Sequence, residues 1–267
     1  MKKLALFTIL NLISIPLFAQ TDSLTINIKN AEKGYVIDNN NKKIDSYVVL
    51  MGNKNNPWNN QRVVKAIALD KVDNTADKVK LTKYFYSDLQ GYGTATRKFE
   101  LIDFANVQAS IKQSRTGESS SVFDVMNATK NLVKQKHLAE VIVDGKYKVY
   151  RLYAYPKNVD IQAGQQAIDE KSEEMDALRN KPSLIYKVGN EKIKFVRLKD
   201  FETIAKNCKN VLDKIKNGDY DALGYSQTKK KSGLVGKLMK VAEDNSLDNS
   251  YNQELIITFF NDLNSCN

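Results

Sequence analysis

Two segments with strand-like sequence, residues 141–144 and 147–155, are joined by a turn at Asp144-Gly145. This pair of segments constrains the fold more than any other feature of the chain. An Asp-Gly turn between such runs is typical of a tight hairpin. Successive residues of a strand point to opposite faces of a sheet. Bulky side chains fall on both faces of the second run: Tyr147, Val149, Arg151, Tyr153 and Tyr155 on one, and Tyr150 and Leu152 on the other. This strand is therefore expected to be central in a sheet or covered on both sides.

The rest of the first half shows a similar pattern of short strands. Turn-forming Asn and Asp residues at 38–43 separate two strands at 36–37 and 44–51, which predicts another hairpin. Further strands are expected at 62–69, 79–86 and 97–103, with loops at 53–61 and 87–93 between them. A short amphipathic helix is predicted at 119–136, and a polar helix at 160–179.

The last third changes to a hairpin and helices. Runs at 184–188 and 192–198 straddle Gly189-Asn190, which predicts the hairpin. A first helix is expected over 201–217, capped by Asp200 and ended by Gly218, and a second helix over 250–263.

These patterns together predict an α+β protein: an antiparallel twisted sheet or partial barrel, followed by a C-terminal hairpin and two packed helices. The expected parts are a signal peptide at 1–19, a β-rich domain at 20–157, a polar helical connector at 158–183 and the C-terminal unit at 184–267. The C-terminal unit is expected to pack on the β-rich part.

The N-terminal residues resemble a cleavable secretory signal. Lys2 and Lys3 precede an apolar run that ends at Phe18-Ala19, and this run is shorter than the roughly 20 apolar residues that a transmembrane helix needs. We therefore expect export to the periplasm or the extracellular space, with association with the outer membrane left open. No transmembrane segment is expected after cleavage.

Two cysteines, Cys208 and Cys266, follow the leader. An oxidising compartment permits a disulfide between them, and closing a loop of this length contributes on the order of 4 kcal/mol in the chain-entropy model. Cys208 also falls on the apolar stripe of the expected first helix, so a free buried thiol is the alternative.

The charge of the chain is strongly uneven. The formal net charge is +10, and removal of Lys2 and Lys3 leaves +8. Residues 184–240 hold fourteen Lys or Arg against six Asp or Glu, a net charge of +8, whereas residues 241–267 hold five acidic residues and no basic ones, a net charge of −5. Either the two regions neutralise each other or a basic loop binds an anionic partner. The candidate polyanion-binding residues are Lys229, Lys230, Lys231, Lys237 and Lys240.

Signals for catalysis are weak. His137 is the single histidine and is expected at the surface or a strand edge, so zinc clusters of Cys and His are excluded and no metal or cofactor is expected. The Ser226 to Lys229 pattern matches S-x-x-K but lies in a polar loop. A hydrolase built on dispersed carboxylates would draw on Asp88, Glu100 and Asp103 near the glycine turn. No catalytic residue is assigned.

Several short motifs resemble those of an uncharacterised family of exported proteins of Bacteroidota. They comprise residues 33–37, 43–48, 83–84, 91–92, 99–100 and 143–146 with Tyr150, and then Cys208, residues 216–220 and residues 259–261. The Leu17-Phe18-Ala19-Gln20 ending of the leader is similar as well. Because this family has no established activity, the resemblance implies compartment and architecture and transfers no catalytic residue.

The sequence favours a non-enzymatic binding or interaction module of the cell envelope with a basic surface. The expected partner is an anionic envelope component or another envelope protein, and nucleic acid is not expected because the positive charge comes mostly from Lys rather than Arg. Two alternatives stay open: a carboxylate-dependent hydrolase acting on an envelope or extracellular substrate, and a structural partner of an outer-membrane assembly.

Overall fold

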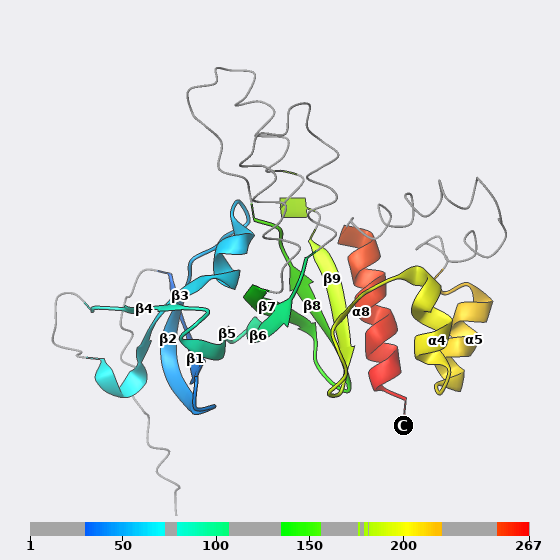
Figure 1. Ribbon diagram of the computed structural model, residues 1–267, viewed down its shortest axis with the longest axis horizontal. Helices are drawn as coiled ribbons and strands as arrows, with labels where there is room; N and C mark the ends of the chain where they lie inside the picture. The colour runs from blue at the N-terminus through cyan, green and yellow to red at the C-terminus, as the bar shows by residue number, and fades with distance from the viewer. Residues whose placement is uncertain are drawn as a thin grey trace, which may run out of the picture.

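A computed structural model describes residues 30–72, 79–106, 135–155, 176, 179–180, 182–220 and 250–266. These residues form an α+β fold around an open, antiparallel sheet, in the order β10-β9-β8-β7-β6-β5-β1-β2-β3-β4 (Figure 1). The strands are β1 (Ala31–Asp38), β2 (Lys43–Leu50), β3 (Val63–Ala68), β4 (Thr82–Phe85), β5 (Leu89–Thr94), β6 (Lys98–Phe104), β7 (Gln135–Val143), β8 (Tyr147–Leu152), β9 (Ser183–Val188) and β10 (Lys194–Phe195). The helices are η1 (Pro57–Gln61), η2 (Leu69–Lys71), η4 (Leu198–Asp200), α4 (Phe201–Ala205), α5 (Lys209–Asn217) and α8 (Ser250–Asn264).

Strand β8 lies inside the sheet, as its pattern predicts. It pairs with β7 on one side and with β9 on the other. Val149 and Tyr150 point to opposite faces, and both side chains are almost fully buried. The two faces of the sheet are therefore both covered at this strand.

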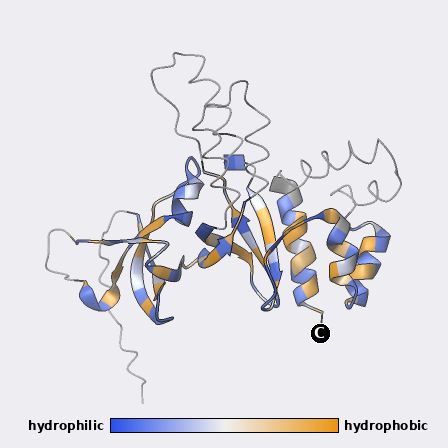
Figure 2. Cartoon of the chain, viewed as in Figure 1, coloured by the Kyte–Doolittle hydropathy of each residue, from blue (hydrophilic) through white to orange (hydrophobic). Residues whose placement is uncertain are grey.

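One face of the sheet, here called the helix face, packs against the C-terminal helices. Helix α8 lies against β8 and β7, with α4 and α5 on its other side (Figure 1). The rings of Phe201 and Phe259 stack with centroids 4.0 Å apart in the core between these elements. Hydrophobic and hydrophilic residues alternate along the helices (Figure 2), because each helix buries only one side.

The helix predicted over 201–217 is divided in the structure. Helix α4 ends at Ala205 and α5 begins at Lys209, with Cys208 between them in an extended conformation. Cys208 is paired there with Cys266, and their Cα atoms are 5.8 Å apart. Of the two alternatives for these cysteines, the structure therefore has the pair at disulfide distance and not the free buried thiol. Gly218 ends α5 in the left-handed conformation, as predicted.

The predicted loop at 87–93 is wrong in part, because β5 begins at Leu89. Glycine is unfavourable in a strand by itself, yet here it permits close approach of two strands. A Cβ atom on Gly34 would lie 2.0 Å from the carbonyl oxygen of Gly93, and the ring of Tyr35 covers Gly93. Pairing with β1 and β6 therefore gives residues 89–93 a strand conformation that their own sequence does not favour.

Some predicted elements fall outside the described residues. These are the leader at 1–19, most of the helix predicted at 119–136, most of the polar connector at 158–183 and the lysines at 229–240. Residues 135 and 136 belong to β7, so no helix extends to them, and Ser183 begins β9. Among the described residues, no helix is long and apolar enough to cross a membrane.

Candidate functional site

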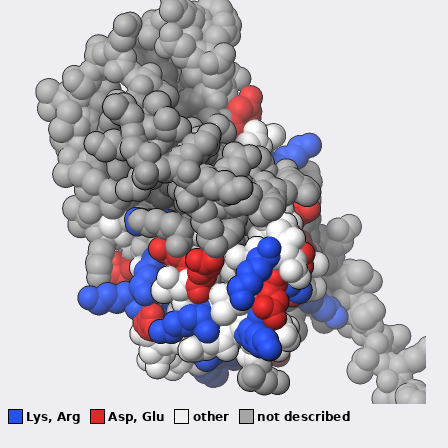
Figure 3. Space-filling model, turned by 90° about the vertical axis from the view of Figure 1, so that its right-hand side faces the viewer, with Lys and Arg blue, Asp and Glu red and all other residues white. Residues whose placement is uncertain are grey.

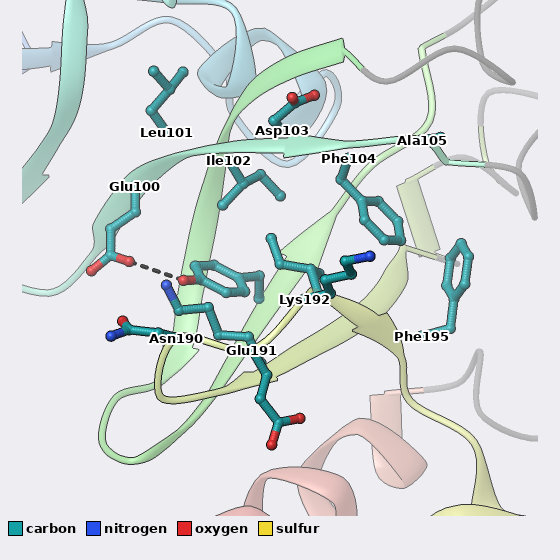
Figure 4. Close-up of a pocket in the computed structure, with 13 residues that line it drawn as sticks. Glu100, Leu101, Ile102, Asp103, Phe104, Ala105, Asn190, Glu191, Lys192 and Phe195 are labelled. Atoms are coloured by element: carbon teal, nitrogen blue, oxygen red, sulfur yellow. Dashed lines mark hydrogen bonds between the residues drawn. The ribbon is translucent and has the colours of Figure 1, made fainter.

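A pocket of about 590 Å³ opens on the face of the sheet opposite the helices, here called the pocket face. Alternation along β6 points Glu100, Ile102 and Phe104 into it, while Leu101 and Asp103 point away (Figure 4). The opposite wall is the β9–β10 hairpin. Its lining residues are Lys187, Asn190, Glu191, Lys192, Ile193 and Phe195.

The floor of the pocket is apolar at one end. Ile102 and Phe104 are buried, and Ile193 and Phe195 pack against them. The rings of Phe104 and Phe195 meet edge to face with centroids 4.9 Å apart. A ligand with an apolar body would find aromatic and aliphatic surface here.

The other end of the pocket carries a charged network around Glu100. The Glu100 carboxylate accepts hydrogen bonds from Lys148 at 2.7 Å and from the Tyr150 hydroxyl at 3.1 Å, and lies 3.0 Å from the Lys98 ammonium (Figure 4 draws the Tyr150 bond). Asp144 joins both lysines, at 2.6 Å from Lys98 and 3.2 Å from Lys148. Two lysines and two carboxylates therefore balance each other on the pocket face.

The network sets the protonation of its members. Burial alone would raise the pKa of Glu100, but the hydrogen bonds and charges of Lys148 and Lys98 outweigh it and leave the pKa below its usual value. Burial, with the neighbouring Glu100 charge, raises the pKa of the Tyr150 hydroxyl. Glu100 is therefore an ion-pair acceptor at neutral pH and Tyr150 stays protonated.

Two lysines of the pocket lining, Lys187 and Lys192, differ from those of the network. Neither side chain makes an ion pair or hydrogen bond with any residue that the structure describes. Glu191, the acidic residue between them in the chain, is 3.2 Å from the Lys194 ammonium. The rim of the pocket thus carries two positive charges that have no ion-pair partner within the described part of the chain.

The carboxylates considered for a hydrolase do not meet. Asp88 lies in the turn between β4 and β5, where it accepts hydrogen bonds from the Phe85 amide at 2.8 Å and the Ser87 hydroxyl at 3.1 Å. Asp103 lies on the helix face of β6, and Glu100 on the pocket face (Figure 4). The described lining of the pocket contains no Ser, Thr, Cys or His.

His137 is buried, so its predicted position at the surface or a strand edge is wrong. It lies in β7 between β6 and β8, with 5% of its surface exposed, and its Nδ1 atom is 3.3 Å from the Tyr155 hydroxyl. Burial lowers its pKa to about 4. The side chain is therefore neutral at physiological pH, and it is not among the residues that line the pocket.

A buried glutamate on the helix face, held by two partly exposed arginines, was not predicted from the sequence. Glu140 on β7 accepts from Arg97 at 2.7 Å and from Arg151 at 3.2 Å. The Glu140 side chain is 9% exposed. This triad lies on the face opposite the pocket, and we interpret it as structural.

Replacing Glu140 by Gln is expected to lower the free energy of unfolding by about 2 kcal/mol, because two guanidinium groups then lose their shared carboxylate in a half-buried site. Urea unfolding followed by circular dichroism measures this loss. The control is Glu191→Gln, which breaks an exposed pair with Lys194 and is expected to cost less than about 0.5 kcal/mol. Equal losses in the two variants would contradict the structural role of Glu140.

The described structure does not test the remaining site residues predicted from sequence. The S-x-x-K pattern and Lys229, Lys230, Lys231, Lys237 and Lys240 lie outside the described residues. Within the described residues, no group of three or more His, Cys, Asp or Glu side chains is arranged to hold a metal ion. No protein-family model, curated protein or solved structure matches the chain.

Proposed function

We propose that the protein is an exported, non-enzymatic binding protein whose ligand site is the pocket between β6 and the β9–β10 hairpin. The observation that carries the proposal is the composition of this pocket: an apolar floor formed by Ile102, Phe104 and Phe195, beside a charged end. Ligand sites in proteins combine such apolar lining with a few oriented polar groups, and their volumes range from about 300 to 1,000 Å³.

Export is part of the same proposal. The leader at 1–19 and the resemblance to exported proteins of Bacteroidota support it, and a cysteine pair at disulfide distance is compatible with an oxidising compartment. An anionic component of the cell envelope remains the proposed partner, and the basic loop at 229–240 remains a second proposed contact for it.

The hydrolase alternative has no comparable support. Its three candidate carboxylates lie in different places, and the lowered pKa of Glu100 is opposite to the raised pKa that a general acid requires. No specific observation favours the structural role in an outer-membrane assembly either. We therefore retain binding as the single proposed function.

Titration with the uncharged fluorescent probe N-phenyl-1-naphthylamine tests the proposal. The mature protein is expected to bind it saturably, and Ile193→Trp, which fills the pocket, to weaken binding at least tenfold. Ile204→Trp is the matched control, since Ile204 is partly buried in the helical layer and does not line the pocket. Unchanged melting temperatures would show that both variants fold. Absence of saturable binding, or equal binding by both variants, would overturn the proposal.

A further inference from the structure

The pocket has two chemically different ends, which lie along a single strand. Glu100 with its lysines is at one end of β6, and Phe104 with Phe195 is at the other (Figure 4). Four residues of a strand span about 13 Å. A ligand that fills the pocket would therefore place a polar group and an apolar group about this far apart.

The charge at the polar end is positive once internal pairs are taken into account. Lys98 and Lys148 are balanced by Glu100 and Asp144. Lys187 is the direct cross-strand neighbour of Lys148, and like charges in this position repel each other. No described acidic side chain pairs with Lys187, so an external anion would relieve this repulsion.

Lys192 adds a second cation at the mouth of the same pocket. It follows the hairpin turn at Asn190 and Glu191, and its side chain is exposed. Like Lys187, it has no acidic partner among the described residues. Two free ammonium groups beside an apolar floor fit one class of ligand.

Resting on the proposed function, we propose that the ligand is an anionic amphiphile bound as a single molecule. Its carboxylate, sulfonate or phosphate group contacts Lys187 at the Glu100 end, and its ring or acyl chain lies on Phe104 and Phe195. Lys192, which extends toward Phe104 (Figure 4), adds positive charge beside the bound molecule. The paired lysines Lys98 and Lys148 hold Glu100, which accepts the hydrogen bond of Tyr150, and they do not hold the anion.

A pair of probes that differ in charge separates the two parts of this proposal. 1-Anilinonaphthalene-8-sulfonate carries a sulfonate, whereas N-phenyl-1-naphthylamine has the same ring skeleton and no charge. The double variant Lys187→Gln/Lys192→Gln is expected to bind the sulfonate about tenfold more weakly and the neutral probe unchanged. The control Lys206→Gln/Lys209→Gln removes two exposed charges from the helical layer, where basic and acidic side chains are intermingled (Figure 3), and should change neither affinity.

The outcomes distinguish this inference from the proposed function. If neither probe binds the wild-type protein, or if Ile193→Trp leaves both affinities intact, the pocket is not a ligand site at all. If the neutral probe binds in the pocket but the sulfonate binds equally well to both double variants, the pocket is a ligand site and the anionic head group is wrong. Competition provides a second readout, since laurate should displace the sulfonate probe at about a tenfold lower concentration than dodecanol does. Displacement by anionic phospholipid vesicles but not by laurate would also overturn binding of a single amphiphile.

Discussion

Replacing both Cys208 and Cys266 by Ala is expected to lower the free energy of unfolding by about 4 kcal/mol. The pair closes a loop with a sequence separation of 58 residues, and in the chain-entropy model a cross-link of this length restricts the unfolded chain by about that amount. Cys208 is also buried between α4 and α5, while Cys266 follows α8. Urea unfolding of the oxidised wild type and of the variant, with equal m-values, measures the difference.

Reduction provides the control for this prediction. The wild-type protein kept in a phosphine reductant should match the double variant, whereas the double variant itself should not respond to the reductant. Mass mapping under non-reducing conditions should find the peptides of Cys208 and Cys266 linked. A variant within about 1 kcal/mol of the oxidised wild type would contradict the expected contribution of the cross-link.

Local sequence signals predicted the elements that depend on neighbouring residues. Asp144-Gly145 gives the turn between β7 and β8, and the bulk on both sides of residues 147–155 places β8 inside the sheet. Gly218 ends α5 because a left-handed residue there costs glycine little. In each case a few adjacent residues determine the backbone conformation.

Features formed by distant residues could not be predicted in the same way. Strand β5 forms because Gly34 of β1 and Gly93 of β5 can approach each other closely. The helix predicted over 201–217 is divided at Cys208, where the pair with Cys266 forms. Neither contact leaves a local pattern.

The candidate site depends on strand register for the same reason. Glu100 of β6 was considered as a catalytic acid, yet β7 and β8 bring Lys148 and Tyr150 beside it and make it an ion-pair acceptor. Lys187 becomes a neighbour of Lys148 only through the pairing of β8 with β9. Composition indicated a basic protein, but only the register shows which lysines are already paired.

Burial of His137 is expected to make the protein less stable as the pH falls from 7.5 to 5. Its pKa is about 4 in the folded protein against an ordinary value of 6.5, so the unfolded chain takes up a proton first. Stability is therefore complete above about pH 6.5 and decreases as the pH is lowered towards 4. The linkage relation gives a loss of about 2 kcal/mol by pH 5 and about 3 kcal/mol in all.

The variant His137→Gln separates this effect from other titrations. Because His137 is the only histidine of the chain, its removal should make the free energy of unfolding nearly constant from pH 7 to pH 5. The lowered pKa values of Glu100 and Asp144 affect stability only in more acidic solution, below their ordinary values of 4.5 and 3.8. Urea unfolding at half-unit pH intervals resolves the two ranges. A wild-type curve that is flat between pH 7 and 5, or an unchanged slope in His137→Gln, would show that the imidazole is hydrated and not buried in β7.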